Sequence, residues 1–348
     1  MKKIEFKSML VSIILVLLIY YFYTPALNIH AIEFWIFIIV ALCIYGASTS
    51  YSTLLGKKFK PEKVGYLGVA VALIVAGVLV TDLFTSKIFH ASRYASRIEV
   101  ENVKFNNKTL HEVDFSKTPI IDRKSTVKLG DKVMGEIPEY VSQFEVSNDY
   151  TQISYKNSVY RVTPLEYASF FKYLTNSKNG IPAYITVNST NGKAEIVKLK
   201  DLGLDGMKYV PSAILNHNLN RKLQLSYPTS VFGSPSFEVD EKGHPWYVCT
   251  TYTYFGVSNK KKVTGAVLFD PITGKSKKYD KDKVPKWVDR VYPEELIMTE
   301  IDENGSLQDG FFNSVLGQKN VTVTSEGYNY LEKDGDIWIY SGITSANK

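Results

Sequence analysis

One stretch, Val64–Phe84, limits the possible folds of this chain more than any other. It reads VGYLGVAVALIVAGVLVTDLF, and its only ionisable side chains are Tyr66 and Asp82. A helix rises about 1.5 Å per residue, so this length covers a hydrocarbon core of about 30 Å. The stretch therefore predicts a transmembrane helix, and the side on which it ends decides where the rest of the chain folds.

Two further apolar runs precede it, at about 8–27 and 31–47. The bulky side chains of Tyr20–Tyr23 stand where a signal peptide would need small residues, and aromatic residues suit the membrane interface. A retained helix is therefore favoured over a cleaved signal peptide. The second run is short and has Glu33 near its start, which leaves a re-entrant segment as the alternative. We expect a membrane domain over residues 1–84 with three transmembrane helices.

Lysines set the expected orientation of these helices. They cluster before the first run and in the loop before the third run, at Lys2, Lys3, Lys7, Lys57, Lys58, Lys60 and Lys63. The connection Thr24–His30 has no Lys or Arg. Short loops rich in lysine stay on the cytoplasmic side. The prediction is a multi-pass protein of the cell membrane, with the lipid bilayer as a partner, a cytoplasmic N-terminus and an extracytoplasmic location for all residues after 84.

Residues 85–135 are expected to form a stalk and a linker. Thr85–Arg97 has near-helical apolar spacing, and its cations Lys87, Arg93 and Arg97 would be solvated or would contact headgroups, with solvation favoured. Alternation from Ile98 suggests a strand. Asp82 is read as an interfacial side chain rather than a functional intramembrane acid, because a charge at the end of a span reaches water cheaply.

Residues 136–348 are expected to form an α+β extracytoplasmic domain with antiparallel sheets. Turn residues recur at intervals too short for parallel βαβ units. The first elements expected are a hairpin over 152–162, a helix from Thr163 or Pro164 to before Asn179, and a hairpin of Ala183–Val187 with Ala194–Leu199. A helix is then expected over 207–225, interrupted or started at Pro211, with Ser212 as its cap.

Next come a strand at Phe237, an Asp-Glu-Lys-Gly turn, a long aromatic strand, and a strand running into Asp270-Pro271-Ile272-Thr273-Gly274. A helix ending in Tyr227-Pro228, antiparallel strands and a D-x-x-T-G turn resemble the PepSY module over about 207–279. The chain resembles bacterial membrane-anchored proteins with such a module. The resemblance implies an association with restraining or assisting extracytoplasmic enzymes.

The chain ends soon after a strand expected at Asp336–Ile343, because Lys348 follows five residues later. No further element would cover that strand. We therefore expect that the sequence is a C-terminally truncated form of a longer protein.

Composition and motifs exclude several function classes. The net charge of +6 is spread along the chain without a dense basic block, so nucleic-acid binding is not expected. No nucleophile elbow, P-loop, HExxH or dinucleotide fingerprint occurs, and no two of the five histidines have metal-ligand spacing. Asp302–Gly305 and Asp334–Asp336 lack the spacing of calcium loops and are interpreted as polar turns. We expect no metal and no cofactor.

The nucleophile and base candidates are few. Cys249 and His244 would lie on opposite faces of one strand, so a buried structural thiol is favoured. Trp246, Tyr252 and Tyr254 share one parity and are the predicted binding face, with core packing as the alternative. The expected function is non-catalytic binding of an envelope protein or peptide. The alternatives are an envelope enzyme using acids such as Glu294 or Asp302, and a membrane sensor or assembly factor.

Overall fold

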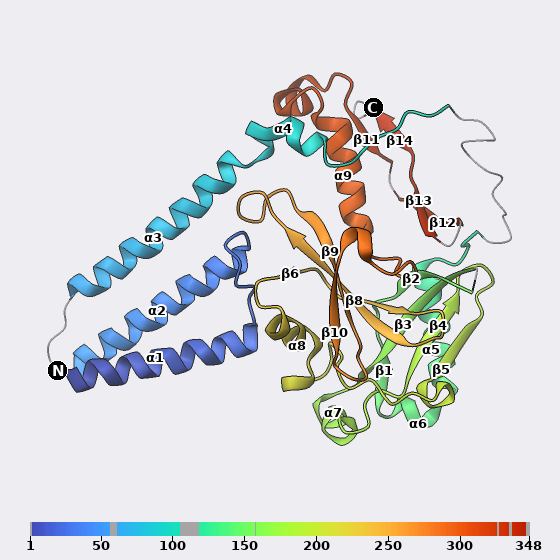
Figure 1. The fold of residues 1–348 in the computed structure, drawn as a ribbon, viewed down its shortest axis with the longest axis horizontal. Coiled ribbons are helices and arrows are strands. Elements are labelled where there is room, and N and C mark those ends of the chain that lie inside the picture. Colours follow the sequence, from blue (N-terminus) through green and yellow to red (C-terminus); the bar gives the residue numbers. More distant parts are fainter. Residues whose placement is uncertain are drawn as a thin grey trace. The chain divides into compact units, whose positions relative to one another are not determined.

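The computed structural model describes residues 2–55, 61–104, 118–156, 158–325, 327–333 and 336–345 (Figure 1). The chain divides into two compact units. The first, here the helical unit, comprises Met1–His90, Leu223–Val231 and Tyr252–Lys262. The second, here the sheet unit, comprises Ala91–Lys222, Phe232–Thr251 and Val263–Lys348.

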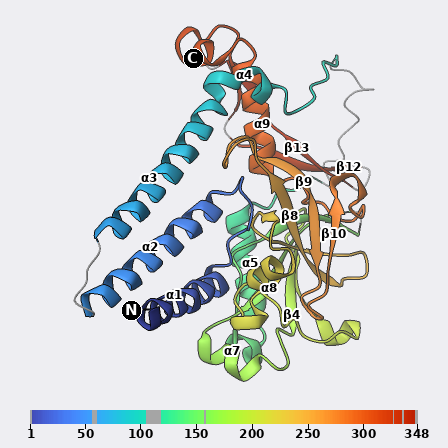
Figure 2. The same ribbon diagram turned by 60° about the vertical axis from the view of Figure 1, so that its left-hand side comes forward.

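Three long helices begin the helical unit: α1 (Lys2–Tyr23), α2 (Ile32–Leu55) and α3 (Pro61–Phe84). Helices α1 and α2 lie side by side in both views (Figures 1 and 2), and Ser12 Oγ lies 2.5 Å from Ser48 Oγ. Among the described residues, Ile32–Ser50 and Val64–Phe84 are long and apolar enough to cross a membrane, whereas the apolar part of α1, Met9–Tyr23, is shorter.

Helix α1 ends four residues before the expected position at Leu27. Thr24 has a positive φ of 42°, and the next residue is Pro25, which disfavours a helical conformation in the residue before it. The expected first span over 8–27 is thus too long as a helix.

The segment Tyr252–Lys262 binds the ends of α2 and α3 within the helical unit. Asp82 Oδ1 accepts hydrogen bonds from the Val257 N–H, at 3.2 Å, and from Asn259 Nδ2, at 3.3 Å. The Ser258 N–H donates to the carbonyl of His30. Asp82 therefore has a structural role in addition to its position near the end of the span.

Helix α4 (Lys87–Ala95) follows α3 after two residues, as expected for the stalk, with a non-helical backbone at His90. The strand expected from Ile98 is wrong in its described part, because Ile98–Lys104 forms no ladder and Val100 and Val103 are exposed. Alternation alone does not make a strand without a neighbour to accept its hydrogen bonds. The remainder of that prediction, at 105–113, lies outside the described residues.

The first sheet of the sheet unit is antiparallel with the order β1-β3-β4-β5, and β2 pairs with β3. Its strands are β1 (Phe144–Val146), β2 (Thr151–Tyr155), β3 (Ser158–Tyr167), β4 (Ala183–Asn188) and β5 (Ala194–Lys198). Both expected hairpins are confirmed. The short helices before β1 are α5 (Arg123–Gly135) and α6 (Pro138–Val141), and η2 (Leu199–Leu202) follows β5.

The helix expected from Thr163 or Pro164 is wrong at its start. Residues 163–167 continue β3, which pairs with β1 and β4, and the carbonyl of Pro164 accepts the Ser147 N–H. The helix there is α7 (Phe170–Asn176), which ends before Asn179 as expected. Strand partners that are distant in sequence decided between helix and strand.

The expected helix over 207–225 shortens to η3 (Leu215–His217) and α8 (Leu219–Ser226). The expected cap, Ser212, instead accepts the Tyr167 N–H, and Asn218 Oδ1 accepts the Arg221 N–H at the start of α8. The cap prediction is therefore wrong, because Ser212 binds β3.

The second sheet has the order β10-β9-β8-β6, with β7 paired to β8. Its strands are β6 (Val231–Phe232), β7 (Ser236–Val239), β8 (Pro245–Thr253), β9 (Lys262–Phe269) and β10 (Ser276–Asp280), and η4 (Lys281–Lys283) follows. A core of Val248, Ala266, Leu268 and Val288 packs with Trp246 and Trp287. In the turn after β9, Asp270 accepts the N–H groups of Ile272 and Thr273.

The C-terminal part contains α9 (Glu294–Leu307), the π-helical turn η5 (Asn313–Gly317), and the hairpin β12 (Asn329–Lys333) with β13 (Asp336–Tyr340). Strands β11 (Thr322–Thr324) and β14 (Ile343–Ser345) also pair, so the strand expected over 336–343 is divided at Ser341-Gly342. The polar turn expected at Asp302–Gly305 is wrong, because these residues form α9. The other expected polar turn, at 334–336, has residues 334 and 335 outside the described part.

Gly305 explains how α9 accommodates its Asn-Gly pair. A Cβ there would lie 2.4 Å from the Thr322 carbonyl, so glycine permits the close approach of β11. Asp302 accepts the Thr324 N–H at 2.7 Å, and Asn304 donates to the Ala95 carbonyl at 2.9 Å. The polar residues that suggested a turn fasten α9 to its neighbours.

Candidate partner-binding surface

Helix α7 is short, and local chemistry fixes both of its ends. Ser169 has an extended backbone, with φ at −165°, and its Oγ accepts the Lys172 N–H at the first turn. Gly180 follows with φ at 78°, and a Cβ there would lie 2.7 Å from the Met207 carbonyl. The helix can therefore extend no further than the glycine turn that leads into β4.

One face of α7 is fastened to the sheet unit by Tyr173. This side chain is buried, and its ring lies 5.2 Å from the ring of Tyr167. Its hydroxyl donates to the Ile214 carbonyl at 3.1 Å and lies 3.2 Å from His217 Nδ1. The helix and η3 are thereby joined through a partly buried polar contact.

The other face of α7 is apolar and exposed. Phe171 is 73% exposed, and Phe170 and Leu174 are each more than half exposed. Leu215, next to the carbonyl that Tyr173 binds, is also more than half exposed. Large apolar side chains grouped on a surface typically mark an interaction site. We call these four residues the α7 surface.

The backbone beneath Leu215 is strained. Its φ is 51°, in the left-handed region that costs a branched residue of this kind about 1–2 kcal/mol. Arg221 Nη1 donates to the Leu215 carbonyl at 2.7 Å and holds this conformation. Strain that the surroundings maintain is typical of functional positions, and here it presents an apolar side chain to solvent.

The chain segment that carries α7 has a positive charge. The segment Ala168–Gly180 contains Lys172 and Lys178 and no acidic residue. An apolar centre with a polar rim is the usual anatomy of a protein interface. The arrangement is therefore suited to a partner that offers apolar side chains flanked by carboxylates.

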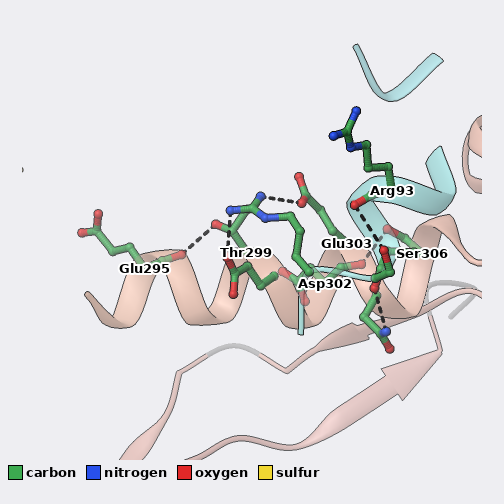
Figure 3. A network of polar contacts seen from close by, with 11 residues as sticks. Arg93, Glu295, Thr299, Asp302, Glu303 and Ser306 are labelled. Atoms are coloured by element: carbon green, nitrogen blue, oxygen red, sulfur yellow. Dashed lines mark hydrogen bonds and ion pairs between the residues drawn. The ribbon is translucent and has the colours of Figure 1, made fainter. Parts of the chain in front are cut away.

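A buried ion network on α9 is structural. Arg97 lies 2.9 Å from Glu300 Oε1 and 2.8 Å from Glu303 Oε2, with all three side chains nearly or fully buried. Figure 3 shows Asp302, Glu303 and Ser306 projecting from α9, with Arg93 on α4. The expectation that Arg97 is solvated or contacts headgroups is wrong, because it pairs with carboxylates in the same unit.

The acids named for an enzymatic alternative also have structural partners. Glu294 pairs with Arg290 at 2.8 Å and accepts the Tyr330 hydroxyl at 2.9 Å. Asp302 binds the backbone of β11. Neither carboxylate has the free, convergent geometry of a general acid and base.

Cys249 is fully buried, as expected for a structural thiol, and burial raises the pKa of this thiol well above its usual range. His244 lies 3.5 Å from Asp270 Oδ1. Burial raises the pKa of Asp270, but hydrogen bonds from His244, Thr273 and Ile272 outweigh it and lower the pKa to about 2. His244 therefore interacts with the D-x-x-T-G turn.

The predicted binding residues fall in different surroundings. Trp246, in the sheet unit, packs on Trp287 with ring centroids 6.1 Å apart, and its Nε1 lies 3.3 Å from Asp240. Tyr252, in the helical unit, is buried beneath the ammonium of Lys261. Tyr254 is half-buried, and burial and the nearby Glu33 raise its pKa. Their role in binding stays a prediction.

Sequence reasoning missed the α7 surface. It placed Phe171 and Leu174 within one longer helix that starts at Thr163 or Pro164, and it assigned no exposed apolar face to that helix. The adjacent pair Phe170-Phe171 was the available signal, because neighbouring helical residues point about 100° apart and a short helix packed on Tyr173 cannot bury both.

Among the described residues, no three His, Cys, Asp or Glu side chains are placed to hold a metal ion. No protein-family model matches this chain, and neither curated proteins nor solved structures include a significant match.

Proposed function

We propose that this chain is a non-catalytic, multi-pass membrane protein whose extracytoplasmic α+β domain binds a protein partner through the α7 surface. The exposed side chains of Phe170, Phe171, Leu174 and Leu215 carry this proposal. Leaving such side chains in water has a cost of about 1.5–3 kcal/mol each relative to burial, which a bound partner would recover.

A protein is the occupant that the chemistry favours. The surface combines two phenylalanines with the lysines at 172 and 178. Aromatic anchors at the centre of an interface supply most of its binding energy, while a charged rim chooses the partner. The partner is expected to present an apolar segment bordered by Asp or Glu, such as an amphipathic helix or an extended peptide.

Photo-crosslinking in intact membranes tests this proposal. A benzophenone amino acid replaces Phe171 in the full-length chain, and the control carries it at the exposed Asn191 in the β4–β5 turn. We expect a discrete adduct from position 171 and none from position 191. Leu174→Asp should remove the adduct without changing the near-ultraviolet circular dichroism of the protein.

Three outcomes would contradict the proposal. An equal yield from both positions would mean non-specific capture. Persistence of the adduct in the Leu174→Asp variant would place the contact elsewhere. An adduct between two copies of this chain would assign the surface to self-association instead of a different partner.

The proposed membrane topology is three spans with the N-terminus in the cytoplasm. Apolar helices α2 and α3 and the packing of α1 on α2 support three spans, and the loop lysines support the orientation. In a Cys43→Ser background, an impermeant thiol reagent should label a cysteine at Asn191 in intact cells and should label one at Gly56 only after the cells are opened. The reverse pattern would overturn both topology and location.

The PepSY resemblance stays part of the proposal. The expected order of helix, antiparallel strands and D-x-x-T-G turn is present as α8, β7, β8, β9 and the Asp270 turn. On this reading the bound protein is an extracytoplasmic enzyme that the domain restrains or assists. Turnover of cell-wall substrates by the purified full-length chain would contradict the non-catalytic assignment.

One observation favours a second candidate function, a sensor or assembly factor that acts through its helices. The segment linking β8 to β9 hydrogen-bonds to Asp82 and His30 at the ends of α3 and α2. Replacing residues 1–84 by an unrelated anchor should abolish the cellular role only if the helices themselves act. Retention of function in that chimaera would leave the anchored binding domain as the explanation.

A further inference from the structure

Two buried polar side chains of the first sheet lack hydrogen-bond partners. Gln152 on β2 is only 8% exposed, yet neither its Oε1 nor its Nε2 makes a hydrogen bond to a described residue. Ser189, directly after β4, is fully buried, and its Oγ also has no partner in the part of the chain that the structure describes. Buried polar groups are nearly always paired with protein, water or a ligand, so these atoms indicate a further partner.

The register of the sheet brings both side chains to the same face as Arg161. Arg161 on β3 lies directly opposite Gln152 on β2 and Val187 on β4. Directly opposed residues present their side chains on one face, with Cβ atoms about 4.5–5.5 Å apart. Ser189 continues the ladder, because its N–H donates to the Val159 carbonyl, and it lies two residues after Val187. Arg161, Gln152 and Ser189 therefore share one face of the sheet.

The segment that leads into α5 fixes Arg161 and Ser189 together. Arg161 Nη1 donates to the Ile121 carbonyl at 2.6 Å and to Thr126 Oγ1 at 2.8 Å. The Ser189 carbonyl accepts the N–H groups of Ile120 and Ile121. Ile121 thus contacts both residues, and the guanidinium is held in place over this face of the sheet.

The guanidinium of Arg161 keeps donors for a further partner. Its two contacts use both protons of Nη1, and no described residue accepts a hydrogen bond from Nε or Nη2 or places a carboxylate within ion-pair distance. Asp122 acts on Arg161 only electrostatically, and its Oδ1 accepts the Ser125 N–H at the start of α5. Arg161 is partly exposed, so the guanidinium is accessible from solvent. The Nε–Nη2 edge matches two oxygens of a carboxylate or a phosphate.

We propose that Arg161, Gln152 and Ser189 form a binding site for a small oxyanion, the phosphate or carboxylate group of a ligand. The guanidinium edge binds two oxygens, and the Gln152 amide and the Ser189 hydroxyl donate to the anion. Arg123 and Lys124, exposed on the first turn of α5, add positive charge near the site. Water alone would pair the amide and the hydroxyl but would bring no negative charge to Arg161. The inference is independent of the partner at the α7 surface.

Isothermal titration calorimetry of the full-length chain in detergent, at constant ionic strength, tests this site with inorganic phosphate and with acetate. Gln152→Met keeps the length of the side chain and removes the amide without breaking a hydrogen bond to a described residue. Arg161→Lys keeps the charge and removes the two-donor edge. The matched control is Gln308→Met, the same substitution at an exposed position after α9.

We expect one saturable site per chain, and binding that is weaker by about tenfold or more in Gln152→Met and in Arg161→Lys but unchanged in Gln308→Met. The anion that binds more tightly identifies the group that the site prefers. Without anion, Gln152→Met should melt at the same or a higher temperature, because the native amide has no hydrogen bond to lose. Gln152→Met therefore decides the test if Arg161→Lys does not fold.

Two results would overturn the proposal. No saturable binding of either anion would assign the unpaired groups to water. Binding to Gln152→Met as tight as to the native chain would place the anion elsewhere on the protein.

Discussion

The sheet unit contains two sites of buried carboxylates, and the buried carboxylates are stabilised by different partners at each. Glu303 and Glu300 on α9 share Arg97, whose guanidinium lies 2.8 Å and 2.9 Å from them. Glu238 on β7 is fully buried and accepts the N–H groups of Asp289 and Arg290 at 3.0 Å and 3.2 Å. Burial, and then the nearby Asp289 carboxylate, raises the pKa of Glu238 to about 8.

The difference shows what each site needs to stay buried. An ionised carboxylate removed from water must be paired with a cation, or it takes up a proton. The α9 site has a cation, and so it joins two distant chain segments by charge. The Glu238 site has backbone N–H donors instead of a cation. With its pKa raised to about 8, the Glu238 carboxyl is mostly protonated at neutral pH. The stability that the α9 site contributes should therefore depend on the charge of Arg97, and the stability that the Glu238 site contributes should depend on pH.

The largest expected effect is the loss of the shared cation. Arg97→Met should lower the free energy of unfolding by about 3–5 kcal/mol, because it leaves two carboxylates buried without their counterion. Urea unfolding of the full-length chain in detergent, followed by tryptophan fluorescence, measures this. Lys124→Met, at an exposed position on α5, is the control and should leave the transition unchanged. A loss below about 1 kcal/mol for Arg97→Met would mean that the network contributes no more than a surface pair.

Neutralising one acid of the network should have an intermediate effect. Glu303→Gln removes a charge-assisted hydrogen bond and leaves Glu300 on Arg97, so we expect a loss of about 1.5–3 kcal/mol. The same urea experiment applies. If the double variant Arg97→Met with Glu303→Gln lost the sum of the two single effects, the residues would be energetically independent, contrary to their 2.8 Å contact.

Glu238→Gln should lower the free energy of unfolding by about 1–2 kcal/mol at pH 7, because Oε1 and Oε2 each accept a backbone N–H and the amide nitrogen that replaces one oxygen leaves that N–H without an acceptor. The native carboxyl holds its proton up to about pH 8, whereas the unfolded one releases it above its ordinary value of 4.5. Its stabilisation is thus full below pH 4.5 and is lost as the pH rises through 8, with a slope of at most about 1.4 kcal/mol per pH unit.

The measurement is the free energy of unfolding across this pH range. Glu238→Gln should remove the corresponding part of the slope, whereas Glu145→Gln, at an exposed position on β1, should retain it. An unchanged slope in Glu238→Gln would show that Glu238 is ionised in the folded protein.

The sequence predicted the elements that depend on local chemistry. The hairpins β2–β3, β4–β5 and β7–β8 and the Asp270 turn follow directly from short Gly, Asn and Asp turns between alternating residues. The long helices α1, α2 and α3 follow from the apolar runs, and α2 and α3 contain stretches long and apolar enough to cross a membrane. Each of these signals lies within a few residues of the structure it specifies.

The incorrect predictions concern segments whose secondary structure or exposure depends on residues that are distant in sequence. Residues 163–167 have helical apolar spacing, but pairing with β1 and β4 makes them a strand. Asp302–Gly305 has turn chemistry, but the close approach of β11 at Gly305 and the partners of Asp302 and Asn304 place it in α9. The α7 surface was missed for the same reason, because exposure of Phe171 depends on how Tyr173 packs.

The smallest effect is expected for an exposed ion pair, which serves as the reference for the buried network around Arg97. Lys193 pairs with Glu195 at the start of β5, and both side chains are mostly exposed, at 72% and 54%. Water and salt screen such a pair, and holding two long side chains in one geometry costs side-chain entropy, so its net contribution is small. Lys193→Ala should leave the urea midpoint unchanged at low and at high salt. A clear loss that disappears at high salt would mean that exposed pairs stabilise this domain, and the large effect expected for Arg97 could then no longer be assigned to burial alone.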